Sequence, residues 1–423
     1  MKLTSATINI SSLNSNRRSL GFLFFVLIAI FSIFPAMSIN FSNFPLVFAI
    51  LVQLLFSIFI ASSISVIRFK KKLFIVSVLL VVYLLVGLFI IPFLSGEISV
   101  LNPRLGIDKQ YLTLSPLNLS ISNVGQFLYL TLNLLFLNAS LYFCQGREKA
   151  YLKIVLMAGW IVVFFLWWQF AYTRGYVSFF PNGLLYTNKF VAVGNEQLMN
   201  GVPRINSTLT EPSLAGAVLS SFYVYYFFSF LKRKTIGSFL SSLIFMSSAL
   251  ITTSFTAILG ILIGSMLGVY IYRRFYFYVL LAVLVVVLII WINAFEVPVQ
   301  LMEKLLSASY LHRAYSNMVS FQMVLDTYGF GVGIGSNRPS SLLASVLSNF
   351  GILGGFLLAL IFFISIGGRK WKKLTSTSQA ILAMLATFVL TMLISIPDYN
   401  LTLLWVFLSL SYVHIVRDGV LND

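Results

Sequence analysis

Charged residues are scarce in this chain, and their scarcity excludes a soluble globular fold. Only 9% of the 423 residues are Asp, Glu, Lys or Arg, whereas 59% are hydrophobic. Soluble proteins carry about 25% charged residues. A chain this apolar needs lipid around most of its surface, so its composition predicts a polytopic membrane protein.

Cysteine and histidine are nearly absent, which limits the chemistry available. The single Cys144 excludes an internal disulfide and a cysteine-based metal site. The acidic residues outside the expected membrane segments form no Asp-x-Asp pair, and no histidine cluster accompanies them. These acids are Glu97, Asp108, Glu196, Glu211, Glu296, Glu303, Asp326 and Asp398. We therefore expect no bound metal and no cofactor.

Long apolar runs are abundant, and they predict an all-α fold of about twelve transmembrane helices. A spanning helix needs roughly 20 apolar residues. The predicted spans are 19–38, 44–67, 73–94, 123–144, 153–172, 212–231, 236–252, 256–272, 275–293, 340–366, 377–396 and 400–416. A weak cleavage-like motif ends the first of them at Ala36-Met37-Ser38. We expect an uncleaved anchor, because the polar stretch before this span is long for a signal peptide.

The basic residues predict how these spans are oriented. With the N-terminus in the cytoplasm, 20 of the 28 Lys and Arg residues fall at every second span boundary, as the positive-inside rule requires. The other eight lie in three long outer loops, 95–122, 173–211 and 294–339. This pattern predicts one polytopic domain, 1–423, with both termini cytoplasmic. It also accounts for the net charge of +17 without any nucleic-acid partner.

The outer loops hold the candidate chemistry, because the predicted spans contain no acidic or basic residue except at their ends. Ion-coupled transporters usually keep ionisable residues at mid-membrane. We therefore expect a site at the outer membrane face rather than a pathway through the bundle. The apolar spacing of segment 301–326, with Met318, Phe321 and Leu325, predicts a helix lying at the membrane surface.

The segment from Arg204 to Glu211 gives the first pair of candidate residues. Pro212 suits the first turn of a helix, so Glu211 is expected at the N-cap of the sixth span, where the helix dipole favours a carboxylate. One interpretation is a capped helix with a nearby counter-ion. The functional interpretation is that Arg204 binds an anionic ligand while Glu211 orients or deprotonates a hydroxyl.

The third loop offers further candidates. Arg313 is either a surface arginine on an amphipathic helix or an anion ligand, and the neighbouring His312 is either an interfacial or a catalytic side chain. The glycine-rich stretch 329–335 lacks the Gly-Lys-Ser/Thr of a phosphate loop, and an all-helical chain offers no strand for a dinucleotide motif. It is either a flexible turn or a backbone cradle for a phosphate.

Taken together, these motifs resemble bacterial O-antigen polymerases of the Wzy type. The resemblance rests on Arg204 before Glu-Pro-Ser, on Arg313 before a Gly-x-Gly-x-Gly-Ser turn, and on the segment Leu-Ser-Asn-Phe-Gly-Ile-Leu-Gly at 347–354. It covers roughly residues 200–355. It implies a helical membrane glycosyltransferase of the C superfamily that joins undecaprenyl-pyrophosphate-linked repeat units at the periplasmic side of the inner membrane.

The resemblance also implies roles for particular residues. Glu211 or His312 would act as the general base. The leaving pyrophosphate would be bound by basic side chains and by the glycine-rich turn, through Arg204, Arg313, Arg174, Arg338, Gly333, Gly335 and Ser336. A chain-length regulator is an implied partner, besides the lipid-linked oligosaccharide and membrane lipid.

Two other functions remain open. O-antigen ligases share this architecture but typically carry a histidine shortly after the glycine-rich turn, where this chain reads Arg338-Pro-Ser-Ser-Leu-Leu. A flippase or exporter of the same lipid-linked unit would need a hydrated central cavity lined by charge, which the spans do not supply. The sequence therefore favours a polymerase.

Overall fold

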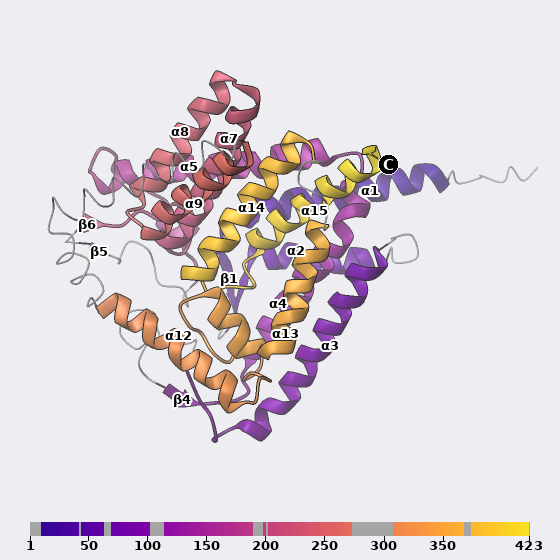
Figure 1. The fold of residues 1–423 in the computed structure, drawn as a ribbon, viewed down its shortest axis with the longest axis vertical. Coiled ribbons are helices and arrows are strands. Elements are labelled where there is room, and N and C mark those ends of the chain that lie inside the picture. The colour runs from indigo at the N-terminus through magenta and orange to yellow at the C-terminus, as the bar shows by residue number, and fades with distance from the viewer. Residues whose placement is uncertain are drawn as a thin grey trace, which may run out of the picture.

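The chain folds into a bundle of helices with three short hairpins (Figure 1). The computed structural model describes residues 10–41, 44–62, 69–101, 114–188, 198–199, 202–272, 308–367 and 374–422. The helices are α1 (Ile10–Phe31), α2 (Phe48–Ala61), α3 (Lys71–Leu94), α4 (Ile121–Cys144), α5 (Glu148–Thr173), α6 (Asn182–Leu185), α7 (Pro212–Arg233), α8 (Ile236–Ile251), α9 (Phe255–Tyr272), α12 (Ala308–Asp326), α13 (Leu342–Ile366), α14 (Ser376–Ser395) and α15 (Thr402–Asn422).

The helices confirm a membrane protein. Among the described residues, six helices are long and apolar enough to cross a membrane, namely α3, α4, α5, α7, α13 and α14, and α2, α8 and α9 are apolar but shorter. Helices occur in eleven of the twelve predicted spans. The remaining span, 275–293, lies outside the described residues.

The ends of the first two predicted spans are wrong. Helix α1 ends at Phe31 instead of residue 38, and α2 covers only Phe48–Ala61 instead of 44–67. The apolar residues between them form an antiparallel hairpin of β1 (Ser38–Phe41) and β2 (Phe44–Val47), in which Ser38 pairs with Val47. Short apolar runs are compatible with either a strand or a helix, so hydropathy alone does not separate the two.

The expectation of a chain without strands is also wrong in two of the outer loops. Loop 95–122 contains β3 (Ser99–Leu101) paired with β4 (Leu114–Pro116), and loop 173–211 contains β5 (Leu198–Met199) paired with β6 (Val202–Pro203). Both pairs are antiparallel and very short. Among the described residues, each pair is a separate two-stranded sheet.

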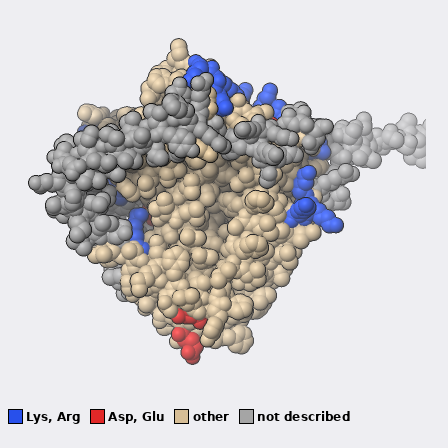
Figure 2. All heavy atoms as spheres, in the orientation of Figure 1, with Lys and Arg blue, Asp and Glu red and all other residues tan. Residues whose placement is uncertain are grey.

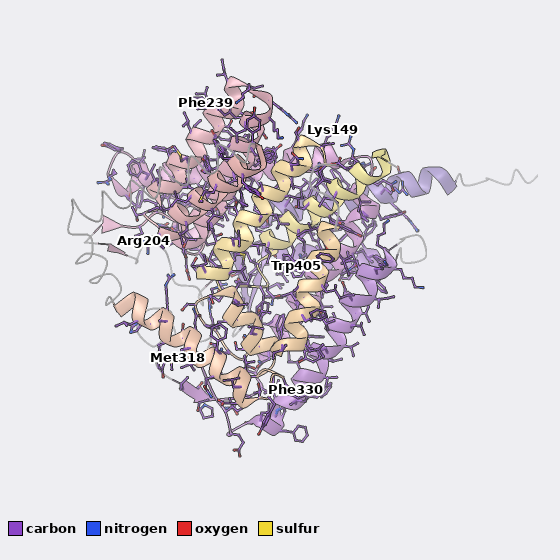
Figure 3. The ribbon with its side chains drawn as sticks, in the orientation of Figure 1. Lys149, Arg204, Phe239, Met318, Phe330 and Trp405 are labelled. Carbon is purple, nitrogen blue, oxygen red and sulfur yellow. The ribbon has the colours of Figure 1, made fainter. Side chains whose placement is uncertain are left out.

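The predicted surface helix is present as α12, whose described part begins at Ala308. Its apolar residues Met318 and Leu325 are 71% and 70% exposed, whereas Ser316, Ser320 and Met323 on another face are buried. Figure 3 shows Met318 on α12 at the edge of the molecule. An exposed apolar stripe of this kind suits a helix that lies on a lipid surface.

Helix α13 is interrupted at Gly351, where φ is 69° and ψ is −175°. The N–H of Val332 donates to the carbonyl oxygen of Ser348 (2.7 Å), and the N–H of Ile352 donates to the carbonyl oxygen of Gly329 (2.8 Å). The glycine-rich turn thus satisfies backbone groups that the break leaves open, as a membrane interior requires. A Cβ at Gly351 would lie 2.3 Å from the Gly329 oxygen, so only glycine fits there.

One hydrophobic core runs through the bundle and draws on α1 to α5, α7 to α9 and α13 to α15. Every residue of α7 from Pro212 to Tyr225 is buried, and the helix packs on α8, α9 and α14. Trp405 of α15 is fully buried at the centre of the molecule (Figure 3). On the face in Figure 2, Asp and Glu gather at the lower tip, while most of the visible Lys and Arg lie along the upper and right edges. A broad uncharged surface separates the two groups.

Candidate active site

A cavity of about 290 Å³ lies where several helix ends meet. Its walls come from the end of α1, the start of α2, the first turns of α4, the start of α7, the glycine-rich turn and the α14–α15 turn. Three charged side chains line it: Glu211, Arg338 and Asp398. Two of these were candidates from the sequence, and Asp398 was known only as an outer acid.

The loop that leads to Glu211 is buried in the bundle. Asn206, Ser207 and Thr208 are inaccessible to solvent. The side chain of Gln169 on α5 holds them: its Oε1 accepts the N–H groups of Asn206 (3.1 Å) and Ser207 (2.7 Å), and its Nε2 donates to Asn206 Oδ1 (2.9 Å). We call this set the Gln169 clamp. Buried backbone groups need such partners, and the clamp lets a polar loop cross an apolar core.

Glu211 occupies the N-cap of α7, as predicted. Its backbone is extended, with φ −143° and ψ 150°, and Pro212 is the first residue of the helix. The hydroxyl of Ser213 donates to Glu211 Oε2 (3.1 Å). The start of the helix therefore fixes where the carboxylate lies, at the positive end of the α7 dipole.

Asn337, the residue before Arg338, is hydrogen-bonded to three elements, namely α12, α13 and β3. The N–H of Asn337 donates to Asn349 Oδ1 (2.9 Å), and Asn349 Nδ2 returns a bond to the Asn337 carbonyl oxygen (2.7 Å). The side chain of Asn337 donates to Ser320 of α12 (2.8 Å) and to Ser348 of α13 (2.9 Å), and its Oδ1 accepts the N–H of Leu101 (3.1 Å). We call this set the Asn349 clamp. It holds the backbone next to Arg338, an exposed residue that lines the cavity.

The glycine-rich turn was predicted to be either a flexible turn or a phosphate cradle, and several of its N–H groups are bonded within the protein. Gly329, Gly331, Gly333 and Gly335 all have positive φ, a conformation that favours glycine. Yet the N–H of Gly335 donates to the Tyr399 hydroxyl (3.1 Å), that of Ser336 to the Gly333 carbonyl oxygen (3.2 Å), and that of Gly331 to the Thr327 hydroxyl (2.9 Å). These bonds leave few donors for a ligand. The turn serves mainly to join α12, α13 and the α14–α15 turn.

Asp398 lies in the α14–α15 turn and presents its exposed surface to the cavity. Its Oδ1 accepts the N–H of Asn400 (3.0 Å). Protein atoms surround this surface, so burial raises the pKa of Asp398 above its usual range, and the charge of Glu211 raises it further. The charge of Arg338 and the Asn400 N–H oppose the rise. A carboxyl with a raised pKa in a cavity is a candidate proton acceptor.

A row of amides leads from the cavity into the bundle. Asn400 Nδ2 donates to the backbone oxygen of Gln126 (2.9 Å), Asn133 Nδ2 donates to the backbone oxygen of Asn400 (3.1 Å), and Gln53 Nε2 donates to Asn133 Oδ1 (2.8 Å). These bonds connect the α14–α15 turn to α4 and α2. They anchor the turn that carries Asp398.

Gly335 also lines the cavity, but the other predicted basic residues and His312 do not. Arg204 is half-buried and lies at the side of the molecule where β5, β6 and α12 are found (Figure 3). Arg313 and His312 are on α12, where Arg313 is exposed and His312 half-buried. Arg174 follows α5, with its guanidinium 5.5 Å from the ring centre of Phe170. Their proposed roles remain predictions.

Several site residues were missed by the sequence reasoning, namely Asp398, Asn400, Gln126, Asn337 and Asn349. The Pro-Asp-Tyr-Asn stretch at 397–400 gave a turn signal between the last two spans, but nothing local indicated a cavity. Within the described part of the chain, no group of three His, Cys, Asp or Glu side chains is placed to hold a metal ion.

Comparison with known proteins adds no relative. No protein-family model matches the chain. No curated protein matches it, and no solved structure does. The functional argument therefore rests on the cavity and on the motifs in the sequence.

Proposed function

We propose that this protein is a glycosyltransferase that polymerises undecaprenyl-pyrophosphate-linked repeat units, an O-antigen polymerase in type. The observation that carries the proposal is the cavity that brings one arginine, Arg338, together with two carboxylates, Glu211 and Asp398. A pyrophosphate leaving group needs a cation, and an attacking sugar hydroxyl needs a base. One cavity supplies both.

The position of the cavity supports a site on the periplasmic side of the inner membrane. In the predicted topology, the end of α1 and the starts of α2, α4, α7 and α15 all lie at the outer face, and each contributes to the cavity. Most of the Lys and Arg residues visible in Figure 2 lie along the upper and right edges of the molecule, and a cytoplasmic face would carry such an excess. Both termini would then be cytoplasmic.

Each of the three side chains takes a role in the proposed reaction. A sugar hydroxyl of the lipid-linked acceptor attacks the anomeric carbon of the donor chain, and the bond from that carbon to pyrophosphate breaks. Arg338 stabilises the charge that grows on the pyrophosphate, because its planar guanidinium binds phosphate oxygens bidentately. Asp398 takes the hydroxyl proton, because its raised pKa makes its carboxylate a stronger base. Glu211 orients the hydroxyl.

The test is polymerisation by the purified full chain in detergent. We would supply synthetic undecaprenyl-pyrophosphate repeat units, with and without chelator, and separate the products on a gel. A ladder spaced by one repeat unit is the expected result, and it should survive the chelator if arginine rather than metal stabilises the leaving group. An intact donor without a ladder would overturn the polymerase, and joining to a finished lipid acceptor would then identify a ligase.

A further inference from the structure

Different segments of the chain supply the apolar residues and the charged residues that line the cavity. Residues between 31 and 50 contribute one polar side chain, Ser32, and six apolar residues, namely Phe31, Pro35, Pro45, Val47, Ala49 and Ile50. The three charged side chains come from other segments, the start of α7, the loop before α13 and the α14–α15 turn. A cavity built in this way suits an amphiphile with an anionic head and an apolar tail.

The cavity is too small to enclose a long lipid. Sites of about 300–1,000 Å³ bury a drug-sized molecule, and this cavity measures about 290 Å³. A lipid of 55 carbons must therefore leave most of its chain outside. The tail needs an opening toward the surrounding bilayer.

Ile121 marks such an opening at the first residue of α4. It lines the cavity and is also 56% exposed on the surface of the protein. Val124 and Leu128 continue the exposed apolar face of α4 at helical spacing. The hydroxyl of Tyr129 donates to the Pro45 carbonyl oxygen (3.0 Å), which links α4 to β2 at the inner end of this stretch. Ile121 thus belongs both to the cavity wall and to an exposed apolar face of α4 that suits contact with lipid.

We infer that the isoprenoid chain of the substrate enters sideways at Ile121, between β2 and α4, and that Pro45, Val47 and Ile50 contact its isoprene units nearest the pyrophosphate. This inference rests on the proposed function, because it takes a prenyl pyrophosphate as the ligand. The apolar residues hold the tail while Arg338 binds the head. Ile121 therefore determines how strongly the lipid-linked form is preferred over the head group alone.

The test compares two substitutions on one helix, Ile121→Asn and Val124→Asn. Both side chains are exposed to a similar extent, 56% and 52%, but of the two only Ile121 lines the cavity. Asn is neutral, so neither variant repels the pyrophosphate. The dissociation constant of undecaprenyl pyrophosphate for the full-length protein in detergent should rise about tenfold in Ile121→Asn, because a polar amide without a partner is costly in an apolar contact. It should change less than about twofold in Val124→Asn.

Inorganic pyrophosphate is the control for the head group, and its affinity should stay the same in both variants. A melting temperature within the error of the parent protein confirms that each variant is folded. Equal effects of the two substitutions on undecaprenyl pyrophosphate would overturn the entry route while leaving the proposed function standing. Displacement of undecaprenyl pyrophosphate by an excess of anionic phospholipid would overturn the isoprenoid assignment. If the parent protein binds no prenyl pyrophosphate at all, the proposed function itself fails.

Discussion

Two loops carry charge to the cavity, and each is held by an amide side chain from a spanning helix. Gln169 of α5 clamps the loop that leads to Glu211, and Asn349 of α13 clamps the loop that carries Arg338. Both clamps satisfy buried backbone groups in an apolar setting. The two clamps differ in the number of residues that separate the clamped residue from the charged residue along the chain.

The two clamps therefore position Arg338 and Glu211 in different ways. Asn337 adjoins Arg338 in the chain, so the Asn349 clamp acts directly on the backbone that carries the cation. The Gln169 clamp ends at Ser207, four residues before Glu211, and the start of α7 fixes the carboxylate instead. We therefore expect the cation to depend on its clamp and the carboxylate to depend on its helix.

The largest effect is expected from removing the cation itself. Arg338→Ala should lower the rate of polymerisation about 10²–10³-fold, because it removes a preorganised contact to the developing charge. The matched control is Arg313→Ala on α12, an exposed arginine that does not line the cavity. Initial rates on synthetic lipid-linked units measure both.

This pair also decides between the structure and the motif resemblance. The cavity predicts that Arg338→Ala is severe and Arg313→Ala mild. The resemblance predicts that Arg313→Ala is severe as well. A mild Arg338→Ala variant would contradict the role that we give to the cavity.

A smaller effect is expected from breaking the clamps. Asn349→Ala leaves the N–H and the carbonyl oxygen of Asn337 without these partners, and Gln169→Ala does the same to the N–H groups of Asn206 and Ser207. An unsatisfied buried group costs about 1–3 kcal/mol, so both variants should unfold at a lower temperature. Only Asn349→Ala should also lower the rate, by about tenfold.

Melting temperature and initial rate should be measured on the same preparations. Equal losses of rate at equal losses of stability would show that the clamps are structural only. That result would contradict the claim that the Asn349 clamp positions Arg338 while the Gln169 clamp does not position Glu211.

The sequence predicted best those features of the fold that depend on residues close together in the chain. Glu211 before Pro212 predicted the start of α7, because an N-cap and its proline are neighbours in the chain. Composition and apolar runs predicted the membrane helices for the same reason. The hairpin between α1 and α2 was missed because short apolar strands and helices share one hydropathy signal.

The site was predictable only in part, because long-range contacts assemble it. Asp398 reaches the cavity because Asn400 bonds to Gln126, 274 residues earlier in the chain. The sequence left the glycine-rich stretch open as a turn or a phosphate cradle, because nothing local shows that Tyr399 takes the N–H of Gly335. Side chains from distant segments thus decided which candidates meet.

The smallest expected effect is a change in melting temperature, and it concerns Asp398. Neither loop carries this residue, but the charges of Arg338 and Glu211 on the two loops both act on its pKa. Burial raises that pKa, so the folded protein prefers the protonated form. The resulting stability is present in full below the pKa of the unfolded chain, about 3.9, and is lost as the pH rises through the raised value. Above the raised pKa, the folded protein must bury a charged carboxylate, which costs stability. Asp398→Asn removes this cost, so the variant should melt at a temperature higher by on the order of 2 °C at pH 7–8. The gain should vanish below about pH 4.

The same measurement in two further backgrounds separates the loops. Arg338 lowers the pKa of Asp398 and Glu211 raises it, with the arginine acting more strongly. The gain in melting temperature from Asp398→Asn should therefore grow in an Arg338→Ala background and shrink slightly in a Glu211→Gln background. An unchanged gain in both would mean that neither charge reaches Asp398, and the cavity would then hold three separate groups instead of one site.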